Sequence, residues 1–100
     1  MASYNELIGK VAIVTGAGRN IGRAIALALA EGGASIVVNA RSNRAEADAV
    51  AREIEAAGGK ALVNIGDVAD AAAMQAMADA AVKLMAGLYQ GKIDLSSLRN

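Results

Sequence analysis

The sequence predicts an α/β fold in which helices flank a parallel sheet of three strands. Compact apolar runs alternate with segments whose apolar residues recur at the helical period, and a short turn joins each run to the next helix. Parallel strands need crossovers of this length, and such crossovers are right-handed. The expected strand order is 3-2-1, as in the first half of a doubly wound α/β fold. One hundred residues suffice for one small domain. We therefore expect residues 1–100 to form a single domain.

The first strand and helix are predicted from residues 11–33. An apolar run over residues 11–14 ends at Thr15 and Gly16, and a helical pattern begins near Ile21. Apolar residues at i, i+4, i+7 and i+8 predict one buried face on this helix. These residues are Ile21, Ile25, Ala28 and Leu29. Gly32 and Gly33 end the helix, as glycine commonly does.

Two further units of the same kind follow. The β-branched run at residues 36–38 predicts a buried strand that ends near Asn39 or Ala40, and residues 44–57 form an amphipathic helix. The predicted inward stripe of that helix contains Val50, Ile54 and Ala57.

A third strand is predicted over residues 61–65, with Asn64 inside it, and a third helix over about residues 71–86. The apolar stripe of this helix contains Met74, Met77, Ala81, Leu84 and Leu88. Residues 93–98 either begin a fourth strand or fray.

Composition excludes several classes of function. Ten basic residues balance ten acidic ones, which removes the charge expected of a protein that binds nucleic acid or an anionic membrane. Without Cys or His there is no disulfide framework, no ordinary metal site, no thiol nucleophile and no imidazole base. Every apolar run is shorter than the roughly 20 residues that span a bilayer. We expect a soluble, cytoplasmic protein.

The glycine-rich turn between the first strand and helix is the most informative stretch. It reads T-G-x-x-x-[G]-x-G over residues 15–22, with Asn20 in place of the bracketed glycine; a strict G-x-G-x-x-G fails because residue 21 is Ile. Gly16 permits a sharp turn and Gly22 a close approach, so free N–H groups at the helix start can meet a pyrophosphate. Asn20 tolerates positive φ and is also a good N-cap. Alternatively, the glycines serve only a tight turn.

Polar residues also follow the second and third strands. Arg41 stands where a dinucleotide fold meets the adenosine ribose, and no acidic residue is present there to accept from the 2′-hydroxyl. Arg41 and Arg19 could instead clamp a 2′-phosphate, while the Asp67 carboxylate could accept from the adenine amino group. The alternatives are that these arginines, with Arg44, are solvated loop residues and that Asp67 only caps a turn.

From about Lys10 to Asp94 the chain resembles the N-terminal part of a short-chain dehydrogenase/reductase, similar to the 3-oxoacyl-acyl-carrier-protein reductase group. The resemblance rests on residues 11–19, 21–26, 57–61 and 66–68. It implies a Rossmann-like half-fold and an NADP cofactor, with NAD disfavoured because of Arg41. The implied cofactor-binding residues are Gly16, Gly18, Arg19, Asn20, Ile21, Gly22, Arg41, Asp67 and Val68.

The catalytic residues of that family have no counterpart in these 100 residues. Gly91 to Asp94 resembles the entry to the family's fourth strand, and there the match stops. The family uses a Ser and a Tyr-x-x-x-Lys pair, whereas here Ile8 follows Tyr4 at that spacing and Ile93 follows Tyr89. The leading interpretation is therefore a truncated, NADP-binding part of a carbonyl or alcohol oxidoreductase, with no catalytic residue of its own.

Two alternatives belong to other classes: a non-catalytic dinucleotide-binding module and a structural module, each completed by another chain. Besides the dinucleotide, the expected partners are copies of the chain, as a homo-oligomer or through an open sheet edge. No nucleic acid, membrane or metal is expected.

Overall fold

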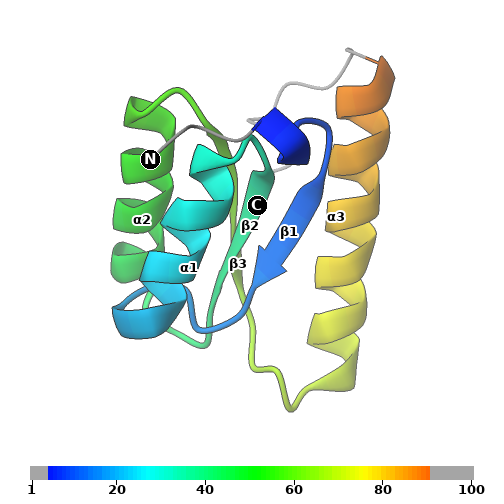
Figure 1. The fold of residues 1–100 in the computed structure, drawn as a ribbon. Coiled ribbons are helices and arrows are strands. Elements are labelled where there is room, and N and C mark those ends of the chain that lie inside the picture. The colour runs from blue at the N-terminus through cyan, green and yellow to red at the C-terminus, as the bar shows by residue number, and fades with distance from the viewer. Residues whose placement is uncertain (1–4, 91–100) are drawn as a thin grey trace.

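The computed structural model describes the backbone of residues 5–90 and the side chains of residues 6–87. A short 3₁₀ helix precedes three strands that alternate with three helices (Figure 1). The elements are η1 (Asn5–Leu7), β1 (Val11–Val14), α1 (Asn20–Glu31), β2 (Ser35–Ala40), α2 (Arg44–Ala56), β3 (Lys60–Ile65) and α3 (Ala71–Gln90). Each predicted strand and helix is present, and α3 extends four residues beyond its predicted end.

The three strands form a parallel sheet in the order β1-β2-β3. This is the predicted 3-2-1 order, and it confirms the Rossmann-like half-fold. β2 lies in the centre and all six of its residues are buried, as expected for a β-branched strand with neighbours on both sides. β1 differs: it pairs only with β2 in the described part of the chain, and Ile13 is 39% exposed. β1 is therefore less buried than β2.

Helices cover both faces of the sheet. α1 and α2 lie on one face and α3 lies on the other (Figure 1). Because successive side chains of a strand point to opposite faces, Ile36 and Val38 join the core under α1 and α2, whereas Val37 packs in the core with α3. In α2, Val50 and Ile54 are buried as predicted, but Ala57 lies beyond the helix end and is exposed.

α3 packs through the stripe that the sequence predicts. Met77, Ala81 and Leu84 are buried and Met74 is partly buried against them. The side chain of Leu88 lies outside the described residues, as do Tyr4, the side chain of Tyr89 and the segments considered as a fourth strand. No helix among residues 5–90 is long and apolar enough to cross a membrane.

The predicted face of α1 is wrong. Ile21 is 76% exposed and Ile25 46% exposed, and Ala28 is also exposed, whereas Ala26 is fully buried. Leu29 is partly buried, as are Gly22 and Ala30, which lie on the same side as Ala26. The helix therefore packs on the core through Ala26 and the partly buried Leu27, Leu29 and Ala30, and the large side chains of Ile21 and Ile25 are exposed.

Candidate functional site

All the predicted cofactor-binding residues lie at one edge of the sheet. Because the strands are parallel, their carboxyl ends meet at that edge, where ligands of open α/β sheets bind. The glycine-rich turn follows β1, Arg41 follows β2, and Asp67 and Val68 come shortly after β3. A hydrogen bond from the Ala17 N–H to the Asn39 carbonyl (2.8 Å) joins the turn to the end of β2.

Glycine is required at two positions of the turn. Gly16 has a φ of +62°, in the left-handed region that glycine adopts without steric cost. A Cβ on Gly22 would overlap the carbonyl oxygen of Gly16, so the helix start packs directly on the turn. Asn20 has a φ of +56°, which confirms the expectation that asparagine takes over a conformation usually filled by glycine.

The start of α1 carries no side-chain cap. Its N-cap position is Arg19, whose side chain makes no capping hydrogen bond, and Asn20 is already the first helical residue; the expectation that Asn20 acts as the N-cap is therefore wrong. By contrast, the Asn43 side chain caps α2, and the Asp70 carboxylate accepts from the N–H groups of Ala72 and Ala73 in α3. The N–H groups at the start of α1 remain available to an anionic ligand.

The remaining predicted residues lie in the glycine-rich turn or close to it at the same edge of the sheet. A Cβ on Gly18 would lie 3.2 Å from the Cβ of Glu46, so the turn packs closely against the start of α2. Arg19 is exposed. Ile21 and Val68 are both exposed large apolar side chains at this edge of the sheet, and they offer apolar contact area to a ligand.

Arg41 and Asp67 form an ion pair that joins the ends of β2 and β3. Arg41 Nε lies 3.4 Å from Asp67 Oδ2, and the Arg41 side chain is 81% exposed. The other carboxylate oxygen, Oδ1, accepts from the Ala69 N–H at 2.9 Å, which is the turn-capping role considered for Asp67. Because a guanidinium carries five N–H donors and this one is largely exposed, Arg41 can also meet another anion.

Asn39 is a residue of this edge that sequence reasoning missed. It lies one position before the end of β2 and is 1% exposed. Its Nδ2 donates to Asn64 Oδ1 at 3.0 Å and to the Gly66 carbonyl at 3.2 Å. Asn39 and Asn64 are register partners on adjacent strands, so the signal was an asparagine after a valine near the end of each strand.

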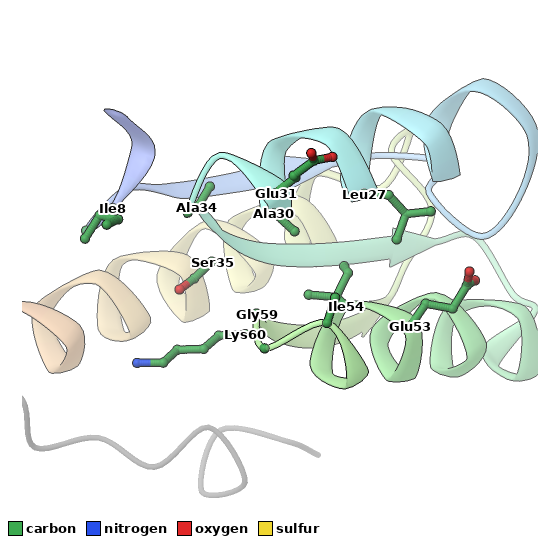
Figure 2. A pocket seen from close by; sticks show the side chains of 14 residues that line it. Ile8, Leu27, Ala30, Glu31, Ala34, Ser35, Glu53, Ile54, Gly59 and Lys60 are labelled. Atoms are coloured by element: carbon green, nitrogen blue, oxygen red, sulfur yellow. The ribbon is translucent and has the colours of Figure 1, made fainter. Parts of the chain in front are cut away.

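A separate hollow of about 800 Å³ opens at the opposite edge of the sheet (Figure 2). Ser35 and Lys60, the first residues of β2 and β3, line it, so it is remote from the glycine-rich turn. Glu53 at its rim accepts from Arg23 Nε at 3.0 Å, and this hydrogen bond, together with the charge of Glu53, raises the pKa of the Arg23 guanidinium. The hollow does not belong to the predicted site.

Comparison with known proteins supports the same fold and family. Residues 10–95 match the short chain dehydrogenase family. The chain is 52% identical over 79 residues to an uncharacterised oxidoreductase of Methylorubrum extorquens, covering 79% of this chain and 32% of that protein. It is 46% identical over 99 residues to versicolorin reductase 1 of Aspergillus parasiticus, covering 97% of this chain and 35% of the relative.

Solved structures agree. A hydroxysteroid dehydrogenase from Escherichia coli superposes with a TM-score of 0.76 at 39% identity, over 82% of this chain and 33% of that one. A short chain dehydrogenase from Mycobacterium avium gives 0.75 at 40% identity, over 87% of this chain and 33% of its own. The chain spans about a third of the length of the curated relatives it matches. It belongs to the short-chain dehydrogenase/reductase family.

Proposed function

We propose that this chain binds NADP through the adenosine and pyrophosphate end of the cofactor. The observation that carries the proposal is the turn after β1, where Gly16, Asn20 and Gly22 hold the uncapped start of α1 at the carboxyl edge of the sheet. N–H groups at a helix start, together with the helix dipole, favour a phosphate group. The residues present therefore fit the pyrophosphate.

The preference for NADP over NAD rests on the end of β2. Ala40 and Arg41 supply no carboxylate to accept from a ribose 2′-hydroxyl, whereas the exposed guanidinium of Arg41 offers several donors to a 2′-phosphate. Asp67 competes for the same guanidinium. Exposed ion pairs contribute only about 0–1 kcal/mol, so a phosphate group that carries more charge can share Arg41 with Asp67 or displace it.

The reaction proposed for the complete enzyme is oxidation of an alcohol or reduction of a carbonyl compound. NADP supplies the hydride acceptor, or NADPH the donor, when bound. This chain's residues bind and orient the adenosine end, and none of its 100 residues forms the family's Tyr-x-x-x-Lys pair. We therefore propose cofactor binding, and no turnover, for the chain as given.

A second candidate is a binding or structural module that another chain completes. The exposed Ile13, Ile21 and Ile25 and the unpaired side of β1 in the described part of the chain favour this candidate, because open apolar strand edges pair with other chains. Light scattering during size-exclusion chromatography separates the two: a stable monomer that binds NADP supports the first, and a dimer without affinity for NADP supports the second.

Calorimetric titration of Arg41→Ala with NADP and NAD tests the proposal. Hydrogen bonds to charged groups are worth roughly 1.5–3 kcal/mol, so we expect the variant to bind NADP about tenfold or more weakly and NAD almost unchanged. Arg52→Ala, which removes an exposed arginine from the middle of α2, is the matched control and should leave both affinities unchanged. Equal losses for the two cofactors would contradict the assignment of Arg41, and a wild-type chain that binds neither would contradict the proposed function.

A further inference from the structure

Asn39 is a buried polar side chain in a strand whose other side chains, apart from Ser35, are apolar. Burying an amide costs free energy unless it is hydrogen-bonded. The Nδ2 atom of Asn39 meets this need with bonds to Asn64 Oδ1 and the Gly66 carbonyl. The bond to Gly66 reaches past the end of β3, into the segment that carries Asp67.

Both the N–H and the carbonyl of Gly66 are hydrogen-bonded to residues at the end of β2. The Gly66 N–H donates to the Ala40 carbonyl at 3.0 Å, and the Gly66 carbonyl accepts from Asn39 at 3.2 Å. Gly66 also lies close to α3, since a Cβ there would lie 3.3 Å from the Cβ of Ala73. Asp67 follows directly, so the direction in which its carboxylate points depends on how the Gly66 carbonyl is held.

Asn39 is also hydrogen-bonded to the glycine-rich turn. The Asn39 carbonyl accepts from the Ala17 N–H at 2.8 Å, and Ala17 is fully buried. Asn39 thus connects the turn after β1 through its main chain and the segment after β3 through its side chain.

We infer that Asn39 is a positioning residue, whose side chain fixes the Asp67 carboxylate relative to the glycine-rich turn so that it accepts from the adenine amino group. This inference rests on the proposed dinucleotide site. Asn39 itself lies in the sheet and acts through the Gly66 carbonyl. A leucine at this position would fill a similar volume and leave the Gly66 carbonyl and Asn64 Oδ1 without their donor, so the Asp67 segment would lose its fixed orientation.

The test compares NADP with its hypoxanthine analogue, in which an oxo group replaces the amino group of adenine. The wild-type chain should bind NADP about tenfold more tightly than the analogue, because Asp67 can accept from the amino group and not from the oxo group. In Asn39→Leu the affinity for NADP should fall about tenfold while that for the analogue stays the same, so the ratio falls toward one. Asn39→Ala has no donor and introduces no larger side chain. If the leucine variant does not fold, the alanine variant should bind NADP and the analogue with a ratio of affinities near one.

Ser35→Ala is the matched control, because Ser35 is the other buried polar residue of β2 and lies at the opposite end of the strand. It should keep the wild-type ratio whatever it does to the melting temperature, which separates positioning from general stability. A wild-type ratio in a folded Asn39→Leu or Asn39→Ala variant overturns the inference, as does an equal change in Ser35→Ala. A wild-type chain that binds both dinucleotides equally overturns it while leaving dinucleotide binding intact, and one that binds neither overturns the proposed function.

Discussion

β2 has a neighbour on each side, and the two sides differ in how completely they are packed. Toward β3, six residues pair in register, and α2 buries Val50 and Ile54 against the sheet. Toward β1 only four residues pair, and the large side chains of Ile13, Ile21 and Ile25 remain exposed. The core on the β3 side is fully packed, whereas the β1 side exposes apolar side chains.

This difference matches the division of the proposed site. Arg41 and Asp67 lie at the well-packed side, and the glycine-rich turn lies where the two sides meet. The adenosine end of a cofactor would therefore lie against the well-packed part of the sheet. The relatives are about three times as long as this chain, and we propose that their additional residues cover the β1 side and supply the catalytic groups.

The largest effect is expected from shortening one isoleucine on each side. Ile54→Ala opens a cavity in the packed core on the β3 side and should lower the free energy of unfolding by about 2–5 kcal/mol. Ile25→Ala removes the same atoms from an exposed helix face and should change it by less than about 0.5 kcal/mol. Urea denaturation followed by circular dichroism measures both. Similar losses in the two variants would show that the β1 side is covered after all.

A smaller effect is expected from two glycines with positive φ. Gly16 (+62°) and Gly58 (+91°) both have open space where a Cβ would stand, so alanine should cost about 1–2 kcal/mol of stability at each, through backbone strain alone. Only Gly16 lies at the proposed pyrophosphate site, so only Gly16→Ala should also weaken NADP binding. Thermal unfolding and NADP titration of both variants check this, and equal loss of affinity would remove Gly16 from the site.

Most of the fold could be predicted from the sequence, because strands and helices follow from local patterns. Compact apolar runs predicted the three strands, and their order was predicted from the pattern of doubly wound α/β folds. The buried face of α1 could not be predicted in this way. Apolar periodicity favours Ile21 and Ile25, but the helix packs through Gly22 and Ala26, since close approach to the turn and sheet requires small residues. The periodicity of apolar residues reflects their hydrophobicity and carries no information about the space between the helix and the sheet.

The sequence predicted the residues of the candidate site one by one, but it did not predict the contacts between them. Arg41 and Asp67 were each predicted from their place after a strand, and nothing in the sequence indicates that they form an ion pair. Asn39 was missed because its partners, Asn64 and Gly66, are 25 and 27 residues away. Such contacts depend on the register between strands, which local sequence patterns do not specify.

The central claim is that this chain holds the adenosine and pyrophosphate end of NADP and not the nicotinamide end. The most direct test compares NADP with 2′-phosphoadenosine 5′-diphosphate, which is NADP without its nicotinamide riboside, by calorimetric titration of the wild-type chain. We expect dissociation constants that agree within about threefold, a difference below about 0.7 kcal/mol. Binding of NADP that is tighter by about tenfold or more would contradict it, because the chain would then also hold the nicotinamide end.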